Sequence, residues 1–129
     1  MSITSNGGFS ILDDVLTEGT NGQFVAVTIA DPVTDETIDT SAITAITATL
    51  RSLDTENAIF EDEDVFPASG SRGSYTDDNE IMITFTAEDM AASGSREMQQ
   101  RLLTLEITHS GGRVFNCAVQ FLLRNLRDA

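Results

Sequence analysis

Hydrophobic residues recur at every second position in five stretches of the chain, and short polar segments separate these stretches. In residues 102–108, for example, leucine or isoleucine alternates with threonine or glutamate. Successive side chains of a strand point to opposite sides, so a period of two predicts strands with one buried face. The stretches are residues 23–30, 45–51, 80–86, 102–108 and 113–123, and weaker strand candidates are residues 9–16, 57–60 and 64–66.

The apolar side of these strands predicts the core. A shift of one residue would turn each apolar set to solvent, so the alternation specifies which face is buried. The many β-branched residues in the stretches also favour a pleated, half-buried surface. We expect the core to contain Val25, Val27, Ile29, Ile46, Ala48, Leu50, Ile81, Ile83, Phe85, Leu103, Leu105, Ile107, Phe115, Val119 and Phe121.

Turn-forming residues separate the strands. Residues 110–112, Ser-Gly-Gly, lie between the last two strong strands and predict a hairpin, because glycine adopts positive φ angles easily. Residues 31–37 predict a turn and residues 67–74 a flexible loop. Residues 86–93 predict the only helix, a short one, because Thr86 can cap it and acidic residues follow.

The number and spacing of the strands predict the architecture. About six to eight short strands, with a turn every eight to twelve residues or so, indicate an antiparallel β-sandwich. A chain of 129 residues is the size of one domain. We therefore expect a flexible N-terminal arm over residues 1–8 and a single sandwich domain over residues 9–129.

The charge balance restricts the partners. The chain has 21 acidic residues against 7 arginines, no lysine, and a net charge of −14. Nucleic acids and anionic membranes attract basic proteins, so neither is an expected partner. No apolar run reaches the roughly 18 residues of a transmembrane helix, and the first residues do not resemble a signal peptide. Cys117 is the single cysteine, which suits synthesis in a reducing cytoplasm.

The same charge predicts a salty environment. A net charge of −14 on a small body is self-repelling. About 1 M salt shortens the Debye length to roughly 3 Å and screens that repulsion. The absence of lysine and the 16 threonines resemble proteins of extreme halophiles. The alternative is an acidic protein from a GC-rich genome, in which coding favours arginine over lysine.

The sequence offers no catalytic constellation. His109, the single histidine, ends a predicted strand beside a glycine turn, where a solvated histidine is usual. Cys117 falls on the predicted inward face, where cysteine behaves as a small hydrophobic residue. The sequence also lacks nucleophile-elbow, P-loop, paired-cysteine and zinc-protease motifs. We therefore expect no enzyme activity, catalytic residue, cofactor, metal site or small-molecule substrate.

A continuous acidic run extends from Glu61 to Asp64. Its oxygens could bind Ca²⁺ or Mg²⁺, but the run lacks the ligand spacing of an EF-hand loop. The interpretation that we favour is a solvated charged segment. Solvated turns are likewise expected at Asp13, Asp14, Asp31, Asp35, Asp39, Asp77 and Asp78.

Several features occur in an order that resembles a known family. They are residues 16–19 before a strand at 24–29, an acidic turn at 31–39, a strand within 40–50, the segment 81–90, and a closing hairpin of 103–107, 111–113 and 115–123. This order is similar to that of small immunoglobulin-like β-sandwich proteins of tailed-virus particles, including the N-terminal domain of phage baseplate upper proteins. Residues 94–101 depart from the family, which often has Gly-x-Tyr at that point.

The resemblance implies an antiparallel, immunoglobulin-like β-sandwich of about six to eight strands with one short helix. It also implies a structural component of a tailed-virus particle, in the tail, baseplate or neck, that acts through protein–protein assembly. The expected location is the virion, and the expected partners are other virion proteins and copies of the chain itself. The alternatives are a capsid decoration protein of the same virion and a cellular β-sandwich binding module.

Some apolar residues lie outside the main strand faces and agree with assembly. If they are exposed, they form patches of the kind that mark interfaces. The alternative is that they fill an ordinary two-sided core. These residues are Phe9, Ile11, Met82, Val114 and Leu122.

Overall fold

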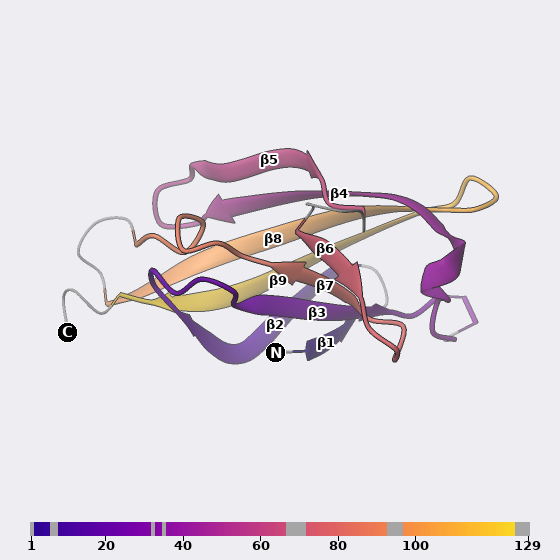
Figure 1. Ribbon diagram of the computed structural model, residues 1–129, viewed down its shortest axis with the longest axis horizontal. Helices are drawn as coiled ribbons and strands as arrows, with labels where there is room; N and C mark the ends of the chain where they lie inside the picture. Colours follow the sequence, from indigo (N-terminus) through magenta and orange to yellow (C-terminus); the bar gives the residue numbers. More distant parts are fainter. Residues whose placement is uncertain are drawn as a thin grey trace.

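The alternating segments form strands in the computed structural model of the chain (Figure 1). The structure describes residues 2–5, 8–31, 33–34, 36–66, 72–92 and 97–125. Within these residues, an all-β architecture is confirmed, with nine strands and one 3₁₀ turn. The elements are β1 (Ser2–Ser5), β2 (Gly8–Thr17), β3 (Phe24–Ile29), the 3₁₀ turn η1 (Thr40–Ala42), β4 (Ile43–Ser52), β5 (Ala58–Asp64), β6 (Gly73–Tyr75), β7 (Ile81–Thr84), β8 (Met98–His109) and β9 (Val114–Arg124).

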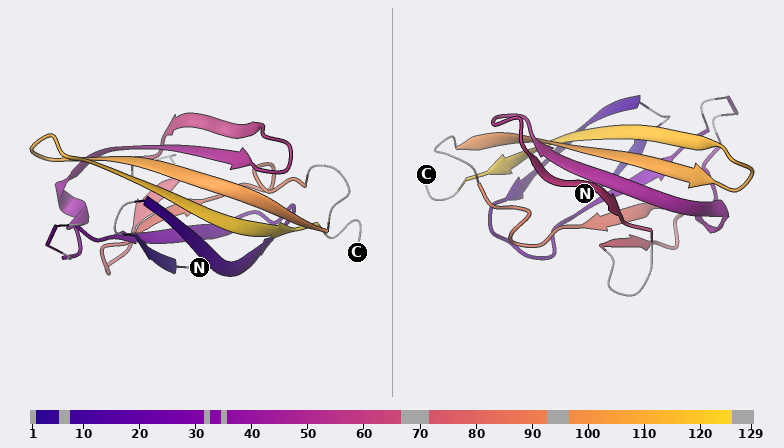
Figure 2. Two further views of the ribbon diagram at one scale, coloured as in Figure 1. Left: turned by 180° about the vertical axis from the view of Figure 1, so that it is seen from behind. Right: turned by 90° about the horizontal axis from the view of Figure 1, so that it is seen from above.

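Two sheets pack face to face as a β-sandwich. One has the strand order β1-β3-β7-β6 and the other has the order β2-β9-β8-β4-β5. In Figure 1, β4, β5 and β8 lie above β3 and β7, and the right-hand view of Figure 2 looks onto the five-stranded sheet. Only the β1–β3 and β2–β9 pairs are parallel among the described strands. The orders β3-β7-β6 and β9-β8-β4-β5 match strands B-E-D and G-F-C-C′ of immunoglobulin domains.

The predicted core is confirmed, because every residue named for it is buried. Phe85, just after β7, and Phe121 of β9 bring their ring centroids to 5.8 Å. The chain exposes 6678 Å². A compact monomer of this mass is expected to expose roughly 6,700 Å². The exposed area of the chain is thus that of a compact body of its mass.

The short helix predicted over residues 86–93 is wrong. The described part, which ends at residue 92, contains a single turn. The amide of Thr86 donates to Oδ2 of Asp89, and the amide of Asp89 donates to Oγ1 of Thr86, so the expected capping residues close this turn. It does not continue as a helix, because the carbonyl of Met90 accepts from the amide of Gly19 (2.9 Å) instead of from a later helical residue.

Two short strands form where the sequence predicted an arm and a loop. Ser2–Ser5, within the predicted arm of residues 1–8, pair with β3 as β1. Gly73–Tyr75, which overlap the loop predicted over residues 67–74, pair with β7 as β6. Residues 67–71 of that loop lie outside the described residues. β1 (Ser-Ile-Thr-Ser) and β6 (Gly-Ser-Tyr) contain one large apolar residue each, so neither shows an alternation that periodicity could reveal. The division into an arm and one domain at residue 9 stays a prediction.

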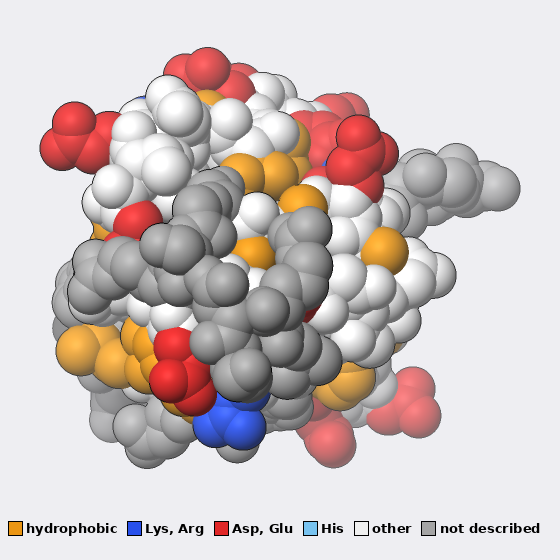
Figure 3. Space-filling model, turned by 90° about the vertical axis from the view of Figure 1, so that its left-hand side faces the viewer, with side chains coloured by type: hydrophobic (Ala, Val, Ile, Leu, Met, Phe, Trp, Pro, Cys, Tyr) orange, Lys and Arg blue, Asp and Glu red, His pale blue; other side chains and the backbone are white. Residues whose placement is uncertain are grey.

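The acidic run lies in β5, which forms one edge of the five-stranded sheet. Glu61, Asp62 and Asp64 are exposed, as expected of a solvated charged segment, whereas Glu63 is half-buried. Acidic side chains also project at several points of the end of the molecule seen in Figure 3, where basic ones are few. Charges along an edge strand discourage pairing with another sheet.

Candidate functional site

The five-stranded sheet turns one face to the core and the other, the outer face, away from it. Along β4, the apolar residues 46, 48 and 50 are buried, whereas Thr47 and Thr49 between them point outward. Every described side chain on the outer face is exposed or half-buried. No described element therefore covers this face.

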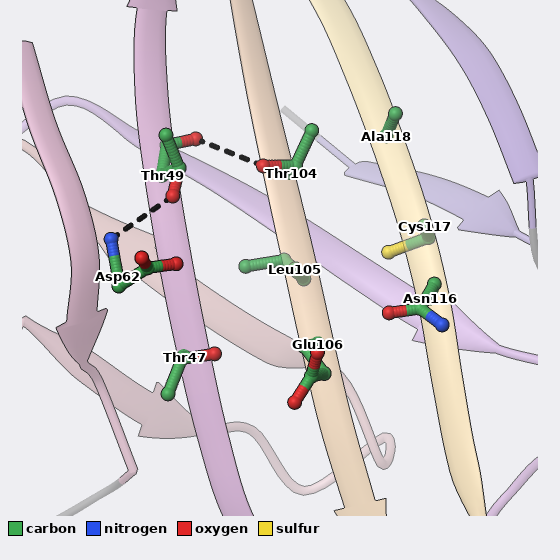
Figure 4. A pocket seen from close by; sticks show the side chains of 9 residues that line it. All are labelled: Thr47, Thr49, Asp62, Thr104, Leu105, Glu106, Asn116, Cys117 and Ala118. Atoms are coloured by element: carbon green, nitrogen blue, oxygen red, sulfur yellow. Dashed lines mark hydrogen bonds between the residues drawn. The ribbon is translucent and has the colours of Figure 1, made fainter. Parts of the chain in front are cut away.

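A groove of about 500 Å³ is hollowed into the outer face (Figure 4). Its lining comes from β4, β5, β8 and β9, and it combines short side chains with oxygen-bearing groups. Hydroxyl, carboxylate and amide oxygens all accept hydrogen bonds, so the groove suits a ligand group that donates several of them. The polar side chains that line it are Thr47, Thr49, Asp62, Thr104, Glu106 and Asn116.

A bulge in β5 brings Asp62 to this groove. The register between β4 and β5 shifts between Ala48 and Leu50. Asp62 lies at the shift with a φ of 48°, in the left-handed region that aspartate adopts more readily than most residues. Its amide donates to Oγ1 of Thr49 (3.0 Å), as a dashed line in Figure 4 shows. Because bulges redirect side chains, a carboxylate of the edge strand β5 lines the groove.

Glu106 supplies the second carboxylate of the groove. It lies opposite Thr47 of β4 on one side and opposite Asn116 of β9 on the other. β4 separates its strand from β5, which carries Asp62. The two carboxylates therefore flank a strip of threonines, and the described part of the groove contains no basic side chain.

An apolar patch adjoins the groove on the same face, formed by Ile11, Leu102 and Leu122. Ile11 of β2 and Leu102 of β8 both pair with Gln120 of β9, and Leu122 follows two positions later. Ile11 and Leu122 border a second depression, of about 320 Å³. Leu102 is two positions along β8 from Thr104, so the patch and the groove are continuous.

The apolar residues expected outside the main strand faces differ in their exposure to solvent. Ile11 is 61% exposed and Val114 is 50% exposed, whereas Met82 and Leu122 are half-buried. The side chain of Phe9 lies outside the described part of the structure. Exposure is thus clear for Ile11 and Val114, which lie toward opposite ends of the outer face.

The structure does not bring His109 and Cys117 together. The ring of His109 packs edge-on against Phe115, with its Nδ1 2.8 Å from the carbonyl oxygen of Ser110. Cys117 is buried and pairs with Leu105, four positions along β8 from His109.

Arg72, which sequence reasoning missed, links β5 of one sheet to the turn that follows β7 of the other. Its guanidinium forms ion pairs with Glu63 of β5 and Asp89 of the turn after β7. It also lies 4.3 Å from the ring centroid of Phe60. Burial opposes the charge, but the hydrogen bonds to Glu63 and Asp89 outweigh it and raise the pKa of Arg72.

Arg101, also missed, is completely buried at the start of β8. It donates to Oγ of Ser52 (3.3 Å), Oε1 of Gln99 (3.1 Å) and the carbonyl of Ala91 (3.3 Å). Burial lowers its pKa, against the attraction of Asp54, which lies 3.9 Å away. One sequence signal existed, because position 101 continues the inward alternation of 103, 105 and 107.

Asp31 and Asp39 form hydrogen bonds within or beside turns. Oδ2 of Asp31 accepts from Arg113 (2.8 Å) and Oδ1 accepts from the amide of Val33, and these bonds lower the pKa of Asp31 to about 2. Asp39 caps η1, and hydrogen bonds from Ser41 lower its pKa. Asp77 and Asp78 are exposed, whereas Asp35 and the side chains of Asp13 and Asp14 lie outside the described residues.

In comparisons with known proteins, no model of a protein family and no curated protein matches the chain. Within the described ranges, no three histidine, cysteine or acidic residues gather as a metal site would require. The described residues also contain no helix of the length and apolarity needed to cross a membrane.

Proposed function

We propose that the protein is a structural subunit of a tailed-virus particle, in its tail, baseplate or neck, and that it acts through protein–protein assembly. The observation that carries this proposal is the uncovered outer face, with exposed Ile11 beside Leu102 and Leu122. Exposed apolar patches next to polar surroundings mark interaction sites in soluble proteins. The order of features along the chain resembles that of small β-sandwich proteins of such particles. This resemblance is the reason why we propose a virus particle as the assembly to which the chain belongs.

The shape of the molecule supports assembly over chemistry. The described strands pack around one cluster of buried residues, so the chain presents a preformed surface. The groove lies open on the surface, and His109 and Cys117 are far apart along the β8–β9 hairpin. A preformed face binds with a smaller entropic cost than a segment that must order on binding.

The test is the composition of purified particles. Particles from the source of the sequence are banded in a density gradient and analysed by mass spectrometry, and the isolated chain is sedimented at high salt. The proposal expects the chain at a fixed copy number relative to the other virion proteins. Absence from the particles together with a strictly monomeric isolated chain would overturn it and favour a cellular binding module. Capsid decoration predicts loss of the chain from tails that have been separated from capsids.

A further inference from the structure

We propose that the outer face docks a basic, extended segment of another protein, with an arginine or lysine side chain in the groove and an apolar side chain on the patch. This inference rests on the proposed function and specifies the chemistry of the partner. It follows from three properties of one continuous face: the charge of the groove, its hydrogen-bonding groups, and its spacing from the patch.

Charge complementarity decides the sign of the partner. Asp62 and Glu106 flank the groove, and the two arginines at described strand positions of the outer face, Arg51 and Arg124, do not line it. A second copy of the chain is a poor occupant, because it has a net charge of −14 and no lysine. Matching potentials steer partners together and disfavour partners of like charge. The groove therefore selects a different, basic protein.

The hydrogen-bonding groups decide the kind of side chain. A guanidinium has five N–H donors and no acceptor, so it needs a site rich in oxygen acceptors. Asp62 and Glu106 supply carboxylates, and the threonines and Asn116 supply hydroxyl and amide oxygens around them. Hydrogen bonds between a guanidinium and a carboxylate are about twice as strong as those between neutral groups. At molar salt such contacts persist, because their length is comparable to the Debye length of roughly 3 Å.

The spacing of the groove and the patch decides the form of the partner. Along β8, Thr104 of the groove is two positions from Leu102 of the patch, and Glu106 is four positions away. A strand rises about 3.3 Å per residue, so the two subsites are roughly 7–13 Å apart. An extended segment bridges this distance when its basic and apolar side chains are about two to four residues apart.

A peptide of this design tests the proposal. The probe is a blocked pentapeptide of sequence Arg-Ser-Leu-Ser-Leu, and binding is followed by the shifts of backbone amide signals in NMR spectra. We expect shifts of Thr49, Thr104 and Asn116 in the groove and of Leu102 and Leu122 in the patch. The same peptide with glutamine in place of arginine should bind about tenfold more weakly, because it forms no charge-assisted hydrogen bond.

Paired variants separate the groove from the overall charge of the chain. The variant Asp62→Asn with Glu106→Gln removes both groove carboxylates, and asparagine tolerates the left-handed backbone at position 62. The control, Glu36→Gln with Asp78→Asn, removes the same charge from exposed loops. The groove variant should lose most of its affinity for the arginine peptide, whereas the control should keep it. Unperturbed amide spectra of the free variants verify that both are folded.

Three results would overturn the docking proposal: equal loss of affinity in both variants, equal binding of the glutamine peptide, or shifts scattered over all acidic surfaces. These outcomes are independent of the proposed function. If the chain is found in purified particles and the arginine peptide does not bind, the docking mode is wrong and the structural role stands. If the peptide binds and the particles lack the chain, the virion placement is wrong and the docking surface stands.

Discussion

At the scale of single residues, the inward face of β8 is tested by Leu105→Ala. Leu105 is 2% exposed and lies between the two sheets. Truncating it should lower the free energy of unfolding by about 2–5 kcal/mol, because the removed atoms leave a cavity. Urea denaturation at constant salt measures this difference. Thr108→Ala, which changes an outward position of the same strand, should cost much less. A loss below about 0.5 kcal/mol at position 105 would show that its burial is wrongly assigned.

The Asp31–Arg113 pair connects the loop after β3 to the start of β9, and it predicts a measurable carboxyl titration. The hydrogen bond from Arg113, followed by that from the amide of Val33, lowers the pKa of Asp31 from 3.8 to about 2. In Arg113→Gln this pKa should rise toward its ordinary value, whereas Arg124→Gln should leave it unchanged. Carboxyl-carbon NMR titration provides the measurement, and an unchanged pKa in Arg113→Gln would contradict the pairing.

The same pair contributes to stability in one direction of pH. The folded pKa of Asp31, about 2, lies below its ordinary value of 3.8. The ionised carboxylate therefore stabilises the folded state above about pH 4, and this contribution is lost as the pH falls toward 2. Stability profiles of the wild type and Arg113→Gln should consequently converge at the acid end of that range and diverge above it.

At the scale of elements, β6 depends on the absence of one side chain. A Cβ at Gly73 would lie 1.7 Å from the carbonyl oxygen of Val65. Gly73→Ala should therefore displace β6 from its position and destabilise the fold by about 1–3 kcal/mol, a typical cost of overpacking. Chemical denaturation, with Ser74→Ala as the matched control, tests this prediction. Equal stability of the two variants would mean that the approach of Val65 to β6 is not as close as the structure has it.

The elements also show what alternation could predict. The strands with four or more alternating positions were all found, because a half-buried strand leaves a period of two in the sequence. β1 and β6 contain one large apolar residue each and no alternation, so pairing with neighbours, and not local pattern, determines them. A helix was predicted wrongly at the turn of residues 86–92 because the capping residues of this turn are those of a helix. The carbonyl of Met90, which a helix would need as an acceptor, accepts from the amide of Gly19 instead.

The candidate site was predictable only in part, because local pattern does not show which residues the pairing of distant strands brings together. The sequence indicated Ile11 and Leu122 as apolar residues outside the main strand faces. The groove did not, because its threonines and carboxylates resemble any solvated strand face. Its lining depends on four strands that are distant in sequence and on the bulge that places Asp62. Such a combination exists only after the sheet has formed.

At the scale of the whole molecule, the charge of −14 predicts a strong dependence of stability on salt. The ion pairs that the structure describes involve only Arg72, Arg101 and Arg113. The Asp31–Arg113 pair lies near the surface, where solvent screens the attraction, so it offsets little of the repulsion. Raising the salt from about 0.1 M to about 2 M should screen the remaining carboxylates and raise the unfolding temperature steadily.

A variant with fewer exposed charges distinguishes repulsion from a general effect of salt on hydrophobic burial. Glu36→Gln, Glu61→Gln, Asp77→Asn and Asp78→Asn change exposed residues only. They bring the net charge from −14 to −10, since four negative charges are removed. If repulsion is responsible, this variant should be more stable than the wild type at low salt and less responsive to added salt. Thermal melts in both salts decide the matter. If the unfolding temperature of the wild type does not change with salt, the argument for a salty habitat fails. The acidic surface would then not make the stability of the fold depend on salt.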